Sequence, residues 1–373
     1  MLEEKERAAL YTLMKIPGMY PARLNAMYAF TESFREALSV SEQDWIRQGV
    51  FKKVPEPGRF EEYRNDRGFL KRAESAYRNL ASSGVRMIDF TEEDMPARLR
   101  TLSDPPKVLF VKGGLPRQDR PSAAVIGSRN CSEYGRMAAA FFGRELSAAG
   151  VQIVSGMAAG CDTASLEGGL NGGTGCFAVL GSGVNVCYPR SSRTVYNRIL
   201  REDGGILSEY CPDEPGIGYH FVIRNRLIAA LGDVLLVIEA REKSGTAITV
   251  ENALEQGKDI FALPGRITDP LGCGCNRLIR DGAMILTGPQ DVLYSLGLSG
   301  KAAKRNPEDL SGLIRDPVQK KILSLLGPDP VHLEEVACRA ALPIPETVSV
   351  LSVLETAGAV RSTGNAYFVK VYR

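Results

Sequence analysis

The stretch from Ser122 to Gly265 decides the fold of this chain. It contains five apolar runs, each ending in glycine, serine, alanine or a charged residue: Ser-Ala-Ala-Val-Ile-Gly-Ser-Arg (122–129), Val-Gln-Ile-Val-Ser-Gly (151–156), Cys-Phe-Ala-Val-Leu-Gly-Ser-Gly (176–183), Asp-Val-Leu-Leu-Val-Ile-Glu-Ala (233–240) and Asp-Ile-Phe-Ala-Leu-Pro-Gly (259–265). Segments with helical spacing separate these runs, which is typical of a parallel sheet covered by helices on both faces. Ligands bind such sheets at the carboxyl ends of the strands. We call the turns at these ends the crest.

Further strands and helices extend this alternation. Residues 84–89 fit an edge strand, 105–113 a second short strand and 283–287 a final strand. Helices are predicted between the strands at 133–149, 162–171, 190–202, 219–231, 247–256 and 276–281. We therefore predict an α/β fold class, with a doubly wound parallel sheet over residues 86–297.

The N-terminal part, residues 1–85, lacks the strand pattern and predicts a small helical domain. Its turn Ile-Pro-Gly-Met-Tyr-Pro (16–21) is similar to a helix-hairpin-helix, in which backbone amides hold a phosphate. Tyr20 stands where such a hairpin has its second glycine, so a plain packing unit of two helices is the alternative interpretation.

A winged helix is predicted at the C-terminal end. Residues 298–315 are polar and low in large apolar residues, which is typical of a linker. Residues 316–373 follow the order helix, strand, helix, helix and hairpin. The third helix, 346–357, carries glutamates but no lysine or arginine, and in a major groove its carboxylates would face phosphates. We expect this domain to contact protein, or to assist DNA binding through Arg361 and Lys370 of the wing.

Composition limits the class of protein. A chain of 373 residues predicts about two to three domains. Its net charge is only +2, so a nucleic-acid site must be a local patch. The eight cysteines form no CxxC pair and only two histidines are present, so we expect reduced thiols and no metal site. The charged N-terminus, and apolar runs well short of the roughly 20 residues that span a bilayer, predict a cytoplasmic protein without a membrane partner.

Glycine turns follow the first three runs of the sheet. A helix start after the first turn favours a phosphate, and Arg129 adds a bidentate contact. Neither the dinucleotide fingerprint nor a Walker lysine is present, and a single bound nucleotide remains the competing interpretation. Three such turns on one edge favour a groove that follows a phosphate backbone. The residues predicted to form it are Gly127, Ser128, Arg129, Ser155, Gly156, Gly160, Gly181 and Gly183.

Aromatic and basic side chains meet in Tyr-His-Phe-Val-Ile-Arg-Asn-Arg-Leu-Ile (219–228). Aromatic rings beside guanidinium groups are how proteins stack unpaired bases and hold their backbone. Arg224 and Arg226 point in different directions on a helix, so at most one reaches the groove directly. The alternative places the aromatic ring in the core and the arginines on carboxylates such as Glu239. The predicted binding residues here and in the next turn are Phe221, Arg224, Asn225, Arg226, Lys243, Ser244, Gly245 and Thr246.

These peptides resemble the DprA/Smf family of DNA-processing proteins. The signature spans roughly 95–290 and includes Pro-Pro-Lys-Val-Leu-Phe-Val-Lys-Gly (105–113), Gly-Ser-Arg (127–129), Ser-Gly-Met-Ala-Ala-Gly-Cys-Asp (155–162), Gly-Ser-Gly-Val-Asn-Val-Cys-Tyr-Pro (181–189), Phe-Val-Ile-Arg-Asn-Arg-Leu-Ile (221–228) and Ser-Gly-Thr-Ala-Ile-Thr (244–249). The resemblance implies an extended Rossmann-like core, a SAM or helix-hairpin-helix-like domain before it and a DML1-like winged helix after it.

The same resemblance implies a function. Members of the family are single-stranded DNA-binding recombination mediators, which work as homodimers, protect incoming strands during natural transformation and help to load the recombinase RecA. By motif, Arg129 would grip a phosphate and Phe221 would stack a base. Gly218 stands where the family often has a lysine, so Arg224 or Lys243 would substitute for it.

Two rival functions stay open. A nucleoside monophosphate phosphoribohydrolase of related Rossmann type would show Pro-Gly-Gly-x-Gly-Thr with a nearby catalytic glutamate, whereas this chain has Glu-Lys-Ser-Gly-Thr (242–246). A transcription regulator would read DNA with the winged helix, against which its acidic third helix argues. Glu251 and Glu255 lack a neighbouring base or metal ligand, and neither histidine has a nucleophile nearby. We therefore expect no catalytic residue and no cofactor.

Overall fold

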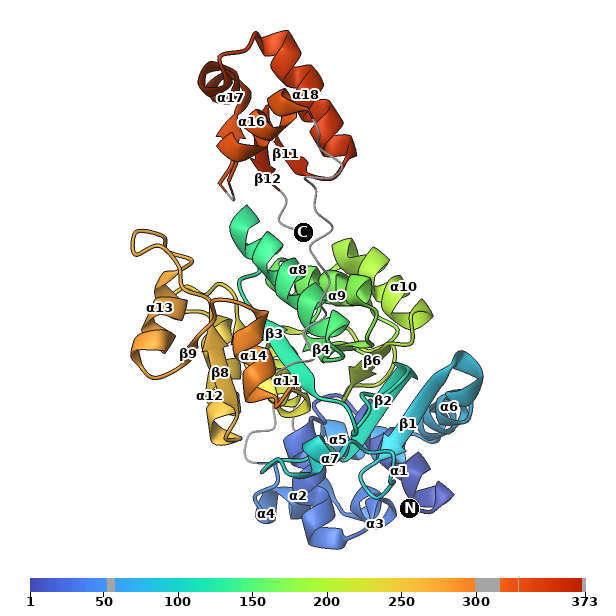
Figure 1. Ribbon diagram of the computed structural model, residues 1–373. Coiled ribbons are helices and arrows are strands. Elements are labelled where there is room, and N and C mark those ends of the chain that lie inside the picture. The colour runs from blue at the N-terminus through green and yellow to red at the C-terminus, as the bar shows by residue number, and fades with distance from the viewer. Residues whose placement is uncertain (52–57, 299–315, 328, 371–373) are drawn as a thin grey trace.

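The computed structural model describes residues 1–51, 58–298, 316–327 and 329–370. A nine-stranded sheet lies in the middle of the molecule, with the N-terminal helices at one end and the C-terminal helices at the other (Figure 1). The strands of this sheet are β1 (Val85–Asp89), β2 (Val108–Gly113), β3 (Ser122–Ile126), β4 (Gln152–Ser155), β5 (Cys176–Val179), β6 (Gly205–Ser208), β7 (Val234–Val237), β8 (Asp259–Ala262) and β9 (Met284–Ile285).

The sheet has the order β1-β2-β6-β5-β4-β3-β7-β8-β9, and all pairs from β6 to β9 are parallel. The α/β fold class is confirmed, and β1 lies at an edge as predicted. The prediction of an all-parallel sheet needs one correction, because β1 and β2 pair antiparallel, as do β2 and β6. No helix lies between β2 and β3. The chain therefore enters β3 at the end where β2 stops, and the two strands run in opposite directions.

Strand β6 was not predicted from the sequence. Its apolar content is limited to Ile206 and Leu207, which is too short a run to stand out. Both residues are fully buried, and β6 pairs with β5 and β2. The neighbouring strands therefore stabilise β6, rather than its own propensity.

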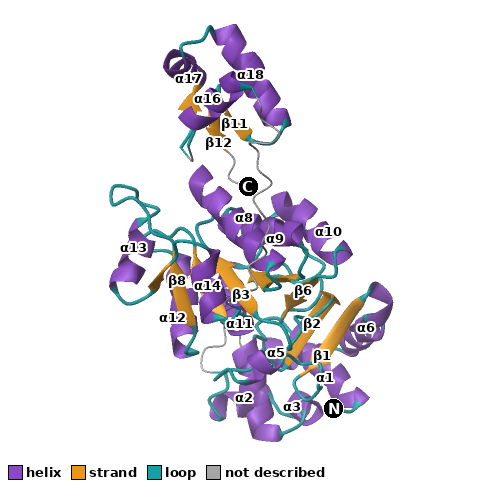
Figure 2. Ribbon diagram, viewed as in Figure 1, coloured by secondary structure: helices purple, strands orange, loops and turns teal. Residues whose placement is uncertain are grey.

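Successive residues of each strand point to opposite faces of the sheet and are buried in two separate cores. The runs are therefore apolar throughout. In β3, Ala123 and Val125 belong to one core, and Ala124 and Ile126 to the other. Helices flank the strands accordingly (Figure 2). The first face is covered by α8 (Glu133–Ala148), α9 (Cys161–Gly172), α10 (Arg193–Arg201) and α14 (Pro289–Ser295). The second is covered by α7 (Ala97–Arg100), α11 (Gly218–Leu231), α12 (Gly245–Glu255) and α13 (Cys273–Arg280).

The N-terminal helices share the first core with the sheet. Leu10 and Trp45 are fully buried in it, and the ring of Tyr11 lies 6.0 Å from that of Phe110 in β2. The helices are α1 (Glu4–Lys15), α2 (Pro21–Thr31), α3 (Phe34–Ser39), α4 (Glu42–Arg47), α5 (Arg59–Asn65) and α6 (Arg67–Arg78). The boundary of a separate domain at residue 85 stays a prediction.

The C-terminal elements have the order of a winged helix, as predicted, with their own core. They are α16 (Pro317–Leu325), β10 (Val331–His332), α17 (Leu333–Ala340), α18 (Ile344–Thr356), β11 (Val360–Gly364) and β12 (Tyr367–Lys370). The wing residue Arg361 forms an ion pair of 3.2 Å with Glu133 at the start of α8. The predicted linker lies outside the described residues apart from Leu298.

In the described part of the chain, no single helix has the length and apolar content to cross a membrane. Only α17 and α18 taken together meet that test, and the pair is bent by 105°.

Candidate functional site

The strand order reverses direction beside β3. From β3 the chain proceeds through β4 and β5 to β6 on one side, and then returns to β7 on the other side of β3. Helix α8 after β3 and helix α12 after β7 cover opposite faces, so a crevice opens between the carboxyl ends of these strands. A cavity of about 390 Å³ lies there, which we call the crest pocket.

The crest pocket brings together many of the predicted binding residues. Those that line it are Gly127, Ser128, Arg129, Phe221, Arg224, Asn225, Ser244, Gly245 and Thr246. An adjoining cavity of about 90 Å³ shares Arg129, Phe221 and Arg224 with it and adds Gly156. The predicted residues that line neither cavity are Ser155, Gly160, Gly181, Gly183, Arg226 and Lys243.

Several of the predicted residues that line neither cavity lie beneath the crest and determine the shape of its turns. The Ser155 hydroxyl is buried and donates a hydrogen bond to the Val125 carbonyl oxygen at 2.6 Å. Gly160 has a φ of +81°, and a Cβ there would lie 2.3 Å from the Ser128 carbonyl oxygen. A Cβ on Gly181 would lie 2.7 Å from the Phe221 ring, so this glycine lets the ring approach the turn. These positions set the shape of the turns by close packing.

The start of α8 is already occupied by a carboxylate. The backbone N–H of Ser132 donates to Glu239 Oε2 at 2.9 Å, and its hydroxyl donates to Oε1. A Cβ added to Gly135 would lie 2.3 Å from Glu239 Cδ, which shows how closely this carboxylate sits against the helix. A negative group at a helix start satisfies its amides and its dipole. The expectation of a phosphate at this helix start is therefore corrected, because Glu239 takes its place.

The start of α12, across the crest pocket, is not capped in this way. Ser244 at its N-cap makes no side-chain capping bond, and its first turn has no acidic residue. Gly245 is exposed and Thr246 is partly exposed, and both line the crest pocket. Arg241, exposed beside them, lines the same pocket. This wall of the pocket therefore offers backbone N–H groups and a guanidinium to an anion.

An aromatic ring and a cation face each other at the opposite wall. The Arg129 guanidinium is exposed and lies 5.7 Å from the centre of the Phe221 ring. Phe221 is partly exposed, and its ring is 5.2 Å from that of Tyr188. The pocket thus combines the two kinds of group that single-stranded nucleic acids require, a π face for bases and cations for phosphates.

Arg224 is buried beneath this surface, where its charge acts on the buried carboxylate of Asp162. Its Nη1 donates to the carbonyl oxygens of Gly156, at 2.9 Å, and Val179. Asp162 accepts a hydrogen bond from the Gly156 N–H at 3.2 Å. Burial raises the pKa of Asp162 to about 6, although Arg224 opposes the shift, and burial lowers the pKa of Arg224 to about 10. Both groups are mainly charged at neutral pH, and the Arg224 hydrogen bond to Gly156 ties the turn after β4 to α11.

Arg226 is buried on another side of α11. Its Nη2 donates to Glu209 Oε1 at 2.7 Å, and its Nε lies 3.8 Å from Asp104. Burial raises the pKa of Glu209, while Arg226 opposes the shift. The two arginines do point apart, as predicted. Arg226 pairs with Glu209 rather than with Glu239, and Arg224 donates to backbone carbonyl oxygens.

Sequence reasoning missed two residues that the structure places at the crest. Arg241 follows the run 233–240 directly, and residues in that position face the carboxyl end of the sheet. Tyr188 lines the adjoining cavity and belongs to the quoted peptide 181–189, but a tyrosine in a loop gives no signal of its own. The capping role of Glu239 was missed because Ser132 is distant from it in sequence.

Cys131, Cys161 and Glu239 also meet at the crest, with one ligand atom of each within 4.8 Å of the others. The contact with Cys131 and burial raise the pKa of the Cys161 thiol. Both carboxylate oxygens of Glu239 already accept hydrogen bonds from Ser132. The cluster therefore fits the packing of the α8 start, and the absence of a metal site stays a prediction.

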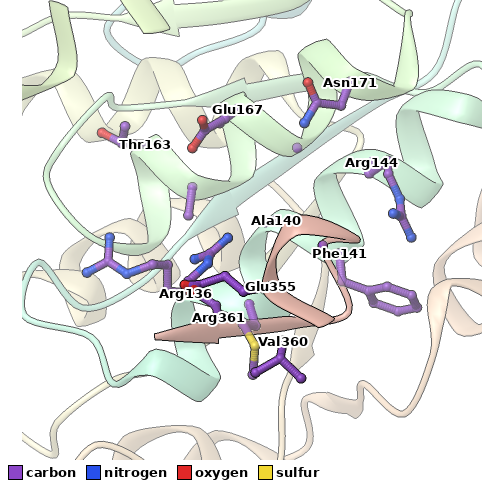
Figure 3. Close-up of a pocket in the computed structure, with 14 residues that line it drawn as sticks. Arg136, Ala140, Phe141, Arg144, Thr163, Glu167, Asn171, Glu355, Val360 and Arg361 are labelled. Atoms are coloured by element: carbon purple, nitrogen blue, oxygen red, sulfur yellow. The ribbon is translucent and has the colours of Figure 1, made fainter. Parts of the chain in front are cut away.

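A larger cavity, of about 500 Å³, lies between α8, α9 and the winged helix. Figure 3 shows Arg136, Arg144 and Arg361 around it, together with the carboxylates of Glu167 and Glu355. These charges oppose one another, and Arg136 and Arg361 also pair with Glu133. The cavity thus has a balanced charge, unlike the crest pocket, where the cations outnumber the single carboxylate.

Comparison with known proteins identifies the family. The family description DNA recombination-mediator protein A matches residues 86–297, and the DprA winged helix domain matches residues 301–365. Protein Smf of Escherichia coli is 34% identical over 304 residues, which cover 80% of each chain. DNA processing protein DprA of Streptococcus pneumoniae is 42% identical over 198 residues, covering 53% of this chain and 70% of the relative. The chain belongs to the DprA/Smf family, and the resemblance seen in the sequence is confirmed.

Solved structures agree with this assignment. The X-ray structure of DprA from Streptococcus pneumoniae has a TM-score of 0.64 at 32% identity, covering 77% of this chain and 97% of that one. DNA processing protein A from Helicobacter pylori, described for its single-stranded DNA binding mode, has a TM-score of 0.51 at 31% identity. It covers 57% of this chain and 95% of its own length.

Proposed function

We propose that this protein is a DNA-processing recombination mediator that binds single-stranded DNA along the crest. The observation that carries the proposal is the composition of the crest pocket. Exposed Arg129 and Arg241 and the uncapped start of α12 suit phosphates, and the partly exposed Phe221 ring suits a base. The described single-stranded DNA binding mode of the Helicobacter pylori relative supports the same ligand.

The pocket favours binding over catalysis. Among its lining residues, all of which the structure describes, there is no histidine or cysteine, and the one carboxylate is Asp162. That carboxylate is buried and held by Arg224 and by backbone amides, so it is not free to act as a base or nucleophile. We therefore propose a protein without enzymatic activity or cofactor, in preference to a phosphoribohydrolase. The predicted contacts at Gly156, Asn225, Lys243, Ser244, Gly245 and Thr246 belong to this proposal.

We also propose a homodimer that assembles through the β9 edge of the sheet. Met284 and Ile285 of this edge strand are 39% and 50% exposed, and Tyr294 of α14 is 80% exposed. An unpaired strand edge with exposed apolar side chains is suited to pairing with a second copy. The proposal also includes three properties that rest on family membership: loading of the recombinase RecA, protection of incoming strands in natural transformation, and a cytoplasmic location.

The test compares a dT oligonucleotide with a duplex of the same length at two salt concentrations. We expect preference for the single strand, and an affinity that falls with salt. Arg129→Ala should weaken binding and lower the salt slope by about 1, because one phosphate contact is lost. Phe221→Ala should cost about 1–3 kcal/mol if a base stacks there.

Two exposed residues provide matched controls. Arg117 pairs with Asp119 before the start of β3, so it lies at the amino end of this strand, whereas the crest lies at the carboxyl end. Phe30, in α2, is 54% exposed. Arg117→Ala and Phe30→Ala should bind the oligonucleotide as the unchanged protein does. Unchanged binding by both crest variants would reject the proposed site.

A further inference from the structure

Tyr188 is an exposed aromatic residue that the crest site described so far does not use. It lies in the loop between β5 and α10 and is 51% exposed. Its ring centre is 5.2 Å from that of Phe221, with an angle of 36° between the ring planes. The two rings line the same small cavity, together with Arg129 and Pro189. We propose that Tyr188 is a second base-stacking residue, which takes the nucleotide next to the one on Phe221.

The loop holds Tyr188 in a fixed place. The Ser182 hydroxyl donates to the Val186 carbonyl oxygen at 2.9 Å, and the Ser192 N–H donates to that of Pro189 at 3.1 Å. The Tyr196 hydroxyl donates to the Val184 carbonyl oxygen at 2.5 Å and so anchors the loop to α10. A ring on such a support needs little ordering when a base arrives, which lowers the entropic cost of binding.

The ring is not required by the packing of the protein. Within the described residues, Tyr188 contacts Phe221 as its aromatic neighbour, and no hydrogen bond of its hydroxyl is found. A single exposed aromatic ring is ordinary. An exposed ring that touches a second one, beside the Arg129 guanidinium at the mouth of an anion-binding pocket, is the arrangement that stacks unpaired bases.

The spacing of the rings decides how bases are received. A base between two rings needs about 7 Å from ring to ring, two stacking distances of about 3.4 Å, the rise per nucleotide in a stacked strand. The centroids of Phe221 and Tyr188 are only 5.2 Å apart, and the rings are tilted. They therefore form one platform that takes two neighbouring bases side by side.

The experiment measures affinity for a dT oligonucleotide and for an abasic strand of the same length. It rests on the proposed function, so Phe221→Ala is measured in parallel. Tyr188→Ala should bind dT about 5- to 150-fold more weakly, the equivalent of one stacked base. Tyr188→Phe should stay within about twofold of the unchanged protein, since the ring and not the hydroxyl makes the contact. Neither change should alter binding of the abasic strand.

A spectroscopic variant gives an independent readout. The chain has one tryptophan, Trp45, which is fully buried, so Tyr188→Trp introduces one exposed indole. We expect its fluorescence to be quenched by dT and unaffected by the abasic strand.

The outcomes separate this inference from the proposed function. If the unchanged protein fails to bind dT, the proposed function fails. If it binds dT and Phe221→Ala weakens that binding, while Tyr188→Ala binds normally and the Tyr188→Trp fluorescence does not respond, the second stacking residue is overturned alone. Equal loss in Tyr188→Phe and Tyr188→Ala would overturn it as well, because the hydroxyl would then carry the effect.

Discussion

Replacing Arg224 by methionine should destabilise the fold before it changes any contact with DNA. Arg224 is 4% exposed, and its positive charge favours the ionised form of Asp162, which is 6% exposed. Methionine fills a similar volume without the charge. Removing the guanidinium leaves the carbonyl oxygens of Gly156 and Val179 without their donor and the buried Asp162 without the opposing charge, which costs about 1–3 kcal/mol. We expect a loss of this size in the free energy of unfolding at pH 8.

The loss should depend on pH in a definite direction. Burial already raises the pKa of Asp162 from its ordinary value of 3.8 to about 6, with Arg224 opposing the shift. Without Arg224 the pKa in the folded state rises further. A raised folded pKa adds stability that is complete below pH 3.8 and disappears as the pH rises through the folded pKa. Between these values the variant should lose about 1.4 kcal/mol of stability per pH unit. Arg224→Met should therefore be less impaired at pH 5 than at pH 8.

Urea unfolding followed by circular dichroism at pH 5 and pH 8 measures both effects. The double variant Arg224→Met/Asp162→Asn removes the unpaired charge and should abolish the extra pH dependence. Arg129→Ala is the matched control, because this arginine is an exposed neighbour in the same pocket and should change stability by less than about 0.5 kcal/mol. An Arg224→Met protein as stable as the unchanged one, but unable to bind DNA, would refute this reasoning and make Arg224 a direct DNA contact.

Two further predictions concern other parts of the crest and the sheet edge. Glu239→Ala leaves the Ser132 N–H and hydroxyl without their acceptor, which should cost about 1–3 kcal/mol in urea unfolding. Added inorganic phosphate should restore stability to this variant more than to the unchanged protein, and equal effects would count against a vacant helix start. Ile285→Asp should shift the protein from dimer to monomer in size-exclusion chromatography with light scattering, since a charge on an apolar interface opposes association. A dimer that persists would place the interface elsewhere.

The central sheet could be predicted from the sequence because its strands are buried on both faces. A run such as 122–129 is then continuously apolar, and its end is marked by glycine and serine. Strand β6 was not predicted, because a strand of four residues with two apolar side chains has only a weak sequence pattern. The antiparallel direction of β2 was not predicted, because it depends on how the chain enters β3 and not on the residues of β2 itself.

The sequence predicted where the candidate site lies, but it did not predict the role of every residue in it. Residues after each strand were expected at the crest, and Arg129, Phe221 and the turn at Ser244 do meet there. The sequence could not predict the burial of Arg224, because Asp162 is distant in sequence and comes close to Arg224 only in the folded protein. Helical spacing showed that Arg224 and Arg226 diverge. It could not show that Arg226 pairs with Glu209 or that Arg224 donates to backbone carbonyl oxygens.

If a strand binds the crest as proposed, the carboxylate of Glu239 favours one path for it over the other. Two helix starts face the crevice between β3 and β7, and each would attract a phosphate if it were free. Glu239 fills the start of α8 and places negative charge on that side, whereas the start of α12 carries none. A phosphate backbone is therefore favoured along α12 and Arg241 and then past Arg129, away from the α8 start. In the proposed binding mode the strand would then reach Phe221 beside Arg129, and Tyr188 beside Phe221, so the carboxylate that stabilises α8 would also direct the strand toward the two aromatic rings.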